Sequence, residues 1–218
     1  MNAISTIEPT MFIIGVDCAT KDAKIGVALA SFKDGKVLLE DVKLCTKEVT
    51  AAATIAEWSR RQEPVLLALD APLGWPATLA KVLSRHRAGD PLHAVANNMF
   101  RRETDCHIKR TVGKMPLDVG ADRIARTAHA ALHLLEDVGT RLHRRISLAW
   151  CPLAIGQIAA IEVYPAATLT AYGFRSQGYK KARQREERRE LIEAVSELIY
   201  PGVSFCAHRL VLLKLLHF

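Results

Sequence analysis

The chain has 218 residues, 50% of them hydrophobic, which is enough to bury a core within one domain, with or without an insertion. This composition excludes a disordered protein, and the formal net charge of +7 fits a phosphate-bearing partner, although moderate basicity is also common in proteins that bind no anion. The five cysteines are odd in number and never form a CxxC pair, which indicates reduced thiols. No apolar run is long enough to cross a membrane and residues 1–10 lack a signal-peptide pattern, so we expect a cytoplasmic protein with no membrane partner.

Two short apolar runs each end in an aspartate, Phe12 to Asp17 and Pro64 to Asp70. Their length and branched residues predict strands buried on both faces of a sheet. Ligands gather beyond the carboxyl ends of such strands, so Asp17 and Asp70 would face one crevice if the strands are neighbours. The pair would then form a metal site or share a proton. Either aspartate alone is more simply a turn cap, but the matched pair favours a joint site.

Between these runs, residues 24–30 and 36–42 predict two more strands, joined by a turn at Asp34-Gly35. Three strands with short links make an antiparallel meander. Residues 50–61 then predict a helix that leads to the second aspartate strand.

Residues 72–116 have weak periodicity, apart from a short helical pattern at 77–87, and we interpret them as an insertion or lid. Its second half is a basic, loop-rich strip that could hold phosphates, although a solvated surface explains it equally well. The basic residues of this strip are Arg101, Arg102, Lys109, Arg110 and Lys114.

Asp118 is a candidate N-cap for a helix that runs to Val138. Asp122 lies in its first turns, where a carboxylate also suits the helix dipole. His129 and His133 have a spacing that can chelate metal, but the glutamate of an HExxH motif is absent, so we do not favour zinc there.

Residues 158–163 predict a further buried strand that contains Glu162. An ionised carboxylate there needs a partner or a metal, unless it points to water at a sheet edge. The charged segment 180–190 predicts a solvated helix that continues to residue 199.

Longer stretches of the sequence resemble the domain of unknown function 429 family, which is regarded as a group of predicted RNase H-like nucleases. The matching stretches are residues 14–20 (IGVDCAT), 69–76 (LDAPLGWP), 100–105 (FRRETD), 111–128 (TVGKMPLDVGADRIARTA) and 161–174 (IEVYPAATLTAYGF). The resemblance implies a single RNase H-like domain over residues 1–218. We therefore expect a three-layer α/β fold with a mixed five-stranded sheet, in which strands 4 and 5 run parallel to strand 1 and helices flank the sheet.

The resemblance also implies that Asp17 and Asp70 bind metal, with further residues in or near the same cleft. The expected catalytic residues are Asp17, Asp70 and Glu162, the expected metal ligands are these three and Asp122, and Arg123 joins the basic strip in binding substrate. Carboxylate oxygens suit Mg²⁺ or Mn²⁺, and two such ions about 3.5 to 4 Å apart can activate water at a phosphodiester.

The C-terminal residues 203–218 contain no acid, whereas nucleases of this fold generally supply a last carboxylate from a C-terminal helix. Such an atypical tail fits a truncation or a shifted reading frame. We therefore expect a divalent-metal-dependent nuclease, with a catalytically weak module that binds nucleic acid or protein as the alternative. A third alternative is a phosphate-binding domain of the actin and sugar-kinase type, since DCATKD (17–22) loosely resembles its phosphate loop.

Overall fold

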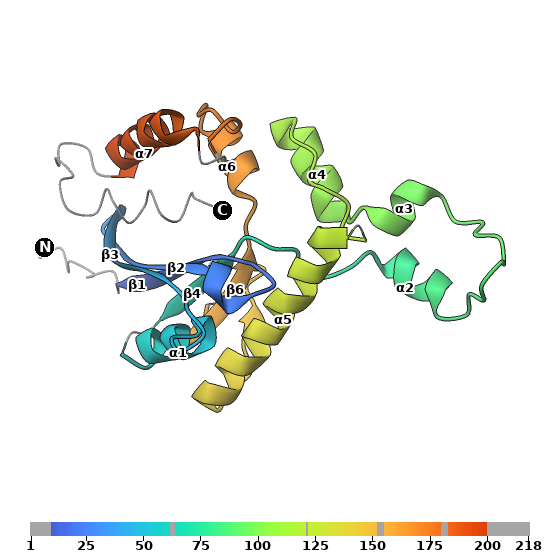
Figure 1. Ribbon diagram of the computed structural model, residues 1–218, viewed down its shortest axis with the longest axis horizontal. Helices are drawn as coiled ribbons and strands as arrows, with labels where there is room; N and C mark the ends of the chain where they lie inside the picture. The colour runs from blue at the N-terminus through green and yellow to red at the C-terminus, as the bar shows by residue number, and fades with distance from the viewer. Residues whose placement is uncertain (1–9, 62–63, 121, 152–154, 180–182, 200–218) are drawn as a thin grey trace, which may run out of the picture.

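The protein is built around one mixed sheet, seen in a computed structural model that describes residues 10–61, 64–120, 122–151, 155–179 and 183–199 (Figure 1). The sheet has six strands in the order β3-β2-β1-β4-β6-β5. The strands are β1 (Met11–Asp17), β2 (Gly26–Lys33), β3 (Lys36–Leu44), β4 (Val65–Leu69), β5 (Ser147–Leu148) and β6 (Ile158–Glu162).

The expected mixed α/β architecture is confirmed. β1, β2 and β3 form the antiparallel meander, and β4 and β6 run parallel to β1. The sheet has six strands and not five, because the short strand β5 pairs with β6 in parallel. β2 begins later than expected, because residues 22–24 form the short 3-10 helix η1 (Asp22–Lys24), in which Ile25 N–H donates to the carbonyl of Asp22.

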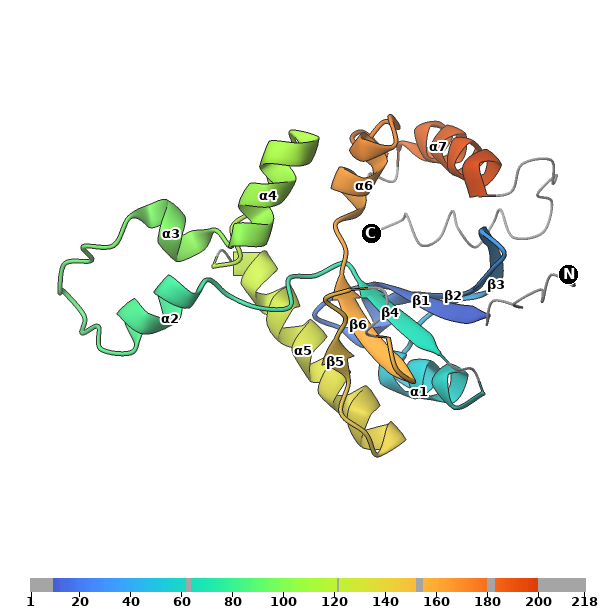
Figure 2. The ribbon, with the colours of Figure 1, turned by 180° about the vertical axis from the view of Figure 1, so that it is seen from behind.

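The hydrophobic core lies on one face of the sheet. Alternate residues of β1 and β4 are almost fully buried there, namely Ile14, Val16, Val65, Leu67 and Leu69. Helices α1 (Ala51–Arg61) and α5 (Asp122–Leu142) pack against this face and contribute Ile55, Ala131 and Val138 to the same cluster. On the other side of the sheet from α1 lie α6 (Pro165–Ala171) and α7 (Arg185–Ile199), as Figures 1 and 2 show.

The sequence predicted that helix α5 begins next to Asp118, but the helix begins at Asp122. The carboxylate of Asp118 accepts a hydrogen bond from Arg101 at 3.2 Å instead of capping a helix, and Val119 is fully buried. Both residues are therefore held by tertiary contacts before the helix starts.

The region 72–116 contains three helices, α2 (Ala77–Leu83), α3 (Ala96–Phe100) and α4 (Glu103–Val112), so the basic strip is largely helical and not loop-rich. The carboxylate of Asp105 accepts from the backbone N–H of Arg102 at the start of α4, and Gly113 ends the helix with a φ of 76°. Helices α2 and α3 form an arm that projects from the sheet (Figures 1 and 2).

Two predictions from the sequence concern residues that the structure does not describe. The tail 203–218 lies outside the described residues, as do Lys180 and Lys181 of the expected charged helix, whose described part is α7. In the part of the chain that is described, none of the helices combines the length and apolar character that crossing a bilayer requires.

Candidate functional site: an acid pair and a pocket

Asp17 and Asp70 lie at the carboxyl ends of neighbouring parallel strands, as the sequence predicted. The last paired residues of β1 and β4 are Val16 and Leu69, and the backbone N–H of Asp70 donates to the carbonyl of Val16 at 3.0 Å. Each aspartate is thus the next residue beyond the same row of the ladder. Because side chains alternate along strands, both are placed on the face opposite to the buried Val16 and Leu69.

The charges of the two aspartates act on one partly buried neighbourhood. Burial raises the pKa of the Cys18 thiol well above its ordinary range, and the charges of Asp70 and Asp17 raise it further. The pKa of Tyr179 is also raised by burial and then by both aspartates, and that of Tyr164 by burial and Asp70. The charges of both aspartates therefore reach the same side chains, Cys18 and Tyr179.

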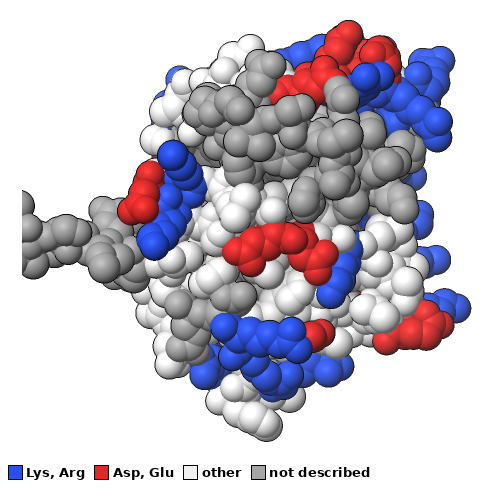
Figure 3. Space-filling view, turned by 90° about the vertical axis from the view of Figure 1, so that its left-hand side faces the viewer, with Lys and Arg blue, Asp and Glu red and all other residues white. Residues whose placement is uncertain are grey.

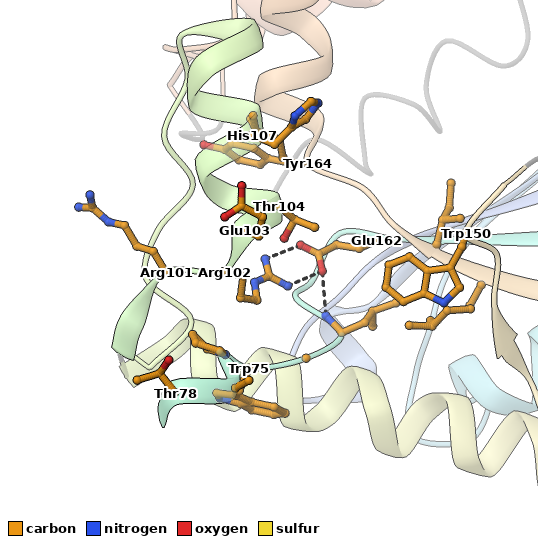
Figure 4. Close-up of a pocket in the computed structure, with 18 of the residues that line it drawn as sticks. Trp75, Thr78, Arg101, Arg102, Glu103, Thr104, His107, Trp150, Glu162 and Tyr164 are labelled. Atoms are coloured by element: carbon orange, nitrogen blue, oxygen red, sulfur yellow. Dashed lines mark hydrogen bonds and ion pairs between the residues drawn. The ribbon is translucent and has the colours of Figure 1, made fainter. Parts of the chain in front are cut away.

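The carboxylate of Glu162, the last residue of β6, forms an ion pair with a cationic side chain of the protein itself. Its carboxylate accepts hydrogen bonds from Nη1 of Arg102 at 2.6 Å and from Nη2 at 2.7 Å, and the backbone N–H of Leu73 donates to it at 3.0 Å (Figure 4). In the ladder, Glu162 pairs with Leu69, so alternation places it on the opposite face from Asp70. The sequence left open whether Glu162 has a partner, binds a metal or points to water, and in the structure its partner is Arg102.

Arg102 is itself held from two sides. Asp105, whose side chain is 2% exposed, accepts from Nη2 of Arg102 at 2.7 Å and from Nε at 3.1 Å. Burial lowers the pKa of Arg102, but the hydrogen bonds and charges of Glu162 and Asp105 outweigh it and raise the pKa above its ordinary value. The network Arg102–Asp105–Glu162 thus joins the start of α4 to the end of β6.

The acidic residues differ in how well they could hold a metal. Among the described residues, no group of three or more His, Cys, Asp or Glu side chains is arranged to hold an ion. Asp122 is an exposed residue that pairs with Arg126 at 3.7 Å. Asp17 and Asp70 remain as two hard oxygen donors in one place, and this set suits Mg²⁺, which is commonly bound by one or two carboxylates together with water and substrate oxygens.

A pocket of about 930 Å³ is lined by the segment that follows Asp70, by α4, and by the ends of β5 and β6 (Figure 4). Asp17 and Asp70 themselves do not line it. The lining residues include Trp75, Arg102, His107, Arg110, Trp150, Glu162 and Tyr164.

The pocket collects part of the predicted basic strip. Arg101, Arg102 and Arg110 line it. Lys109 instead donates to the carbonyl of Gly113 at 2.9 Å, and Lys114 lies 3.4 Å from the hydroxyl of Ser176. Arg123 is an exposed residue in the first turn of α5.

The sequence reasoning missed the aromatic residues of the pocket. Trp75 could have been found, because it follows Asp70 closely in a Gly-Trp-Pro turn. Trp150 stands in no recognisable pattern, and only the fold brings it to the same pocket.

The net positive charge does not produce a basic surface on every side. On the face in Figure 3, which is the left-hand side of Figure 1, acidic and basic groups alternate across the described residues. This face gives no support to a nucleic-acid contact, in contrast to the arginine-lined pocket.

The fold and the acid pair define an α/β protein with a mixed sheet and a candidate site at the carboxyl ends of its parallel strands. The chain belongs to the family described as "Protein of unknown function (DUF429)", whose sequence profile matches residues 15–211. No curated protein matches the chain. A solved structure described as "Structural Study of the Aquifex aeolicus PPX-GPPA enzyme" is similar with a TM-score of 0.27 and 12% identity, over 71% of this chain and 36% of that one. The chain thus spans about a third of the length of that protein.

Proposed function

We propose that this protein is a divalent-metal-dependent nuclease of RNase H-like organisation, which hydrolyses phosphodiesters at Asp17 and Asp70. The observation that carries the proposal is the placement of these two carboxylates beyond one ladder row of adjacent parallel strands. The strand order supports it, since an antiparallel meander is followed by parallel strands and the acids end the first and fourth.

In this mechanism Asp17 and Asp70 would hold Mg²⁺ or Mn²⁺. The ion would supply Lewis-acid activation of water and stabilisation of negative charge at the phosphodiester. Two carboxylates at neighbouring strand ends would repel each other, and a divalent cation would relieve that repulsion. Cys18 stays a neutral thiol at physiological pH because its pKa is raised, and it therefore adds no further negative charge.

A second candidate is a module of the same fold that binds nucleic acid or protein with weak or no catalysis. The specific observation in its favour is that Glu162, the expected third acid, is held by Arg102 and Leu73. A site with only the two carboxylates of Asp17 and Asp70 would bind the ion less tightly than a site with three. The two candidates therefore differ in metal affinity and in turnover.

The test is the response of the fold to Mn²⁺ or Mg²⁺ in wild type and in Asp17→Asn. A metal that binds only the folded state at 100 times its Kd raises the free energy of unfolding by about 2.7 kcal/mol, which thermal melts resolve. Asp17→Asn removes one ligand charge along with the repulsion, so the metal-free variant should be as stable as wild type or more stable. Its metal response and any Mg²⁺-dependent cleavage should be lost together.

Asp137→Asn is the matched control, because it removes the same charge from an exposed position on α5. It should leave the metal response and cleavage unchanged. If Asp17→Asn instead destabilises the metal-free protein and keeps the full Mn²⁺ response, Asp17 is a turn cap and the nuclease proposal fails. Metal stabilisation without cleavage of any nucleic acid would favour the binding module.

A further inference from the structure

The pocket carries two tryptophan rings that contact water. Trp75 is 38% exposed and Trp150 is 82% exposed, and Figure 4 shows both at the border of the pocket. Exposed tryptophans offer a large apolar face, and such faces gather where a ligand or partner binds. By contrast, the third tryptophan of the chain, Trp58, is buried in α1.

The same pocket also contains a cationic side chain that a bound anion could contact. Arg110 is 61% exposed and pairs with Glu103, which is 84% exposed, at 2.8 Å. An exposed ion pair of this kind contributes little stability, so a phosphate can replace Glu103 at small cost. His107 also lines this part of the pocket, on the same helix as Arg110.

The pocket is connected to the acid pair through the chain and through space. The segment 73–76 that forms one wall follows directly on Asp70 and Ala71. Tyr164 lines the pocket and feels the charge of Asp70, which together with burial raises its pKa. A ligand in the pocket would therefore contact Tyr164 and the segment that follows Asp70, although Asp70 itself does not line the pocket.

We propose that the pocket receives one unpaired nucleotide of a single-stranded nucleic acid, with its base against Trp150 or Trp75 and a phosphate at Arg110. This inference rests on the proposed nuclease function and names its substrate class. A volume of about 930 Å³ lies within the range of small-ligand pockets, about 300 to 1,000 Å³, and leaves room for a nucleotide. In a duplex both faces of a base are covered by its neighbours, so only an unpaired or extruded base can stack on a tryptophan.

The experiment measures binding of a single-stranded oligothymidylate, of about eight nucleotides, in EDTA, by tryptophan fluorescence and by anisotropy of a labelled strand. Loss of one base stack should weaken binding by about 5- to 150-fold in Trp150→Ala, and by a similar factor in Trp75→Ala. Tyr172→Ala is the matched control, because Tyr172 is also an exposed aromatic residue, at 65%, but does not line the pocket. It should bind as wild type does.

Three further arms define the ligand. A duplex of the same length should bind more weakly than the single strand, and a free mononucleotide should bind more weakly still, because it lacks the other backbone contacts. Arg110→Gln should reduce the salt dependence of binding by about 0.7 in the slope of log affinity against log salt. Arg126→Gln, an exposed arginine of α5 outside the pocket, should leave that slope unchanged.

Thermal melts of each variant separate loss of binding from loss of folding. Trp150 is mostly exposed, so Trp150→Ala should melt as wild type does. If Trp75→Ala lowers the melting temperature, Trp75→Phe keeps a ring at this place and should retain most of the binding.

The proposal is overturned if the wild type does not bind the strand, if it binds the duplex equally well, or if both tryptophan variants bind like wild type. None of these results depends on metal, because EDTA is present throughout. Asp17→Asn should bind the strand at least as tightly as wild type in EDTA. Failure of the pocket is therefore distinguishable from failure of the metal site, which the Mn²⁺ response tests separately.

Discussion

The buried carboxylate of Asp105 gives the sharpest test of how the site is held together. It makes two hydrogen bonds to the guanidinium of Arg102 and one to its backbone N–H, and its side chain is 2% exposed. Breaking a buried ion pair by removing one partner costs about 3 to 5 kcal/mol. Because Glu162 still pairs with Arg102, we take about 2 kcal/mol of that cost and add about 1 kcal/mol for the lost helix cap.

Asp105→Ala should therefore lower the free energy of unfolding by about 3 kcal/mol, measured by urea denaturation at neutral pH. Glu103→Ala is the matched control on the same first turn of α4, since it removes an equal charge. Glu103 is exposed and pairs only weakly with Arg110, so its removal should change stability by less than about 0.5 kcal/mol. The difference between the two variants measures what the buried ion pair and the helix cap contribute beyond the loss of one charge.

An Asp105→Ala protein as stable as Glu103→Ala would refute the reasoning. It would mean that the network contributes no net stability, as happens when desolvation of buried charges cancels their attraction. The shape of the pocket should also change in Asp105→Ala, because Arg102 contacts both Asp105 and Glu162.

Two further expectations concern packing and thiol chemistry. Gly139→Ala should lower the free energy of unfolding by about 1 to 3 kcal/mol, because the added Cβ would lie 2.8 Å from the carbonyl oxygen of Arg144. Gly156 has open space around it, so Gly156→Ala should leave the free energy of unfolding unchanged in the same denaturation assay. Burial, and after it the charge of Asp22, raises the pKa of Cys45 to about 11. At pH 8 an aromatic disulfide reagent should therefore label the exposed Cys151 quickly. Cys45 should be labelled only after unfolding or as the pH approaches 11. Equal labelling of the two thiols in the folded protein, or equal stability of the two glycine variants, would contradict these expectations.

The strands that end at Asp17 and Asp70 were the most predictable part of the fold. Their sequences are apolar along the whole run, although only alternate residues are fully buried and the residues between them are partly buried. These two strands are neighbours because the order of elements along the chain leaves few positions in the sheet where a parallel strand can be added. β5 could not be predicted, since two residues carry no pattern and their pairing depends on β6.

The helical character of the basic strip was less predictable, because its cause is not local. Helix α4 starts where Arg102 is held by Asp105, its neighbour on the same turn, and also by Glu162 at the end of β6. Helix α5 starts late for a similar reason, since Asp118 is engaged by Arg101. In both cases a contact between segments sets the helix boundary, and residue propensity does not reveal such a contact.

Glu162 shows how far chemical reasoning from sequence can go. An ionised group in an apolar strand needs compensation, and the sequence indicates this need without specifying the partner. The structure supplies an arginine from the N-cap of α4 and a backbone N–H from the segment after Asp70. The carboxylate of Glu162 therefore connects three segments that line the pocket. A carboxylate already bound in this way would have to exchange Arg102 for a cation before it could act as a metal ligand. Its structural role is therefore to position the segment that follows Asp70 against α4, which links the shape of the pocket to the acid pair.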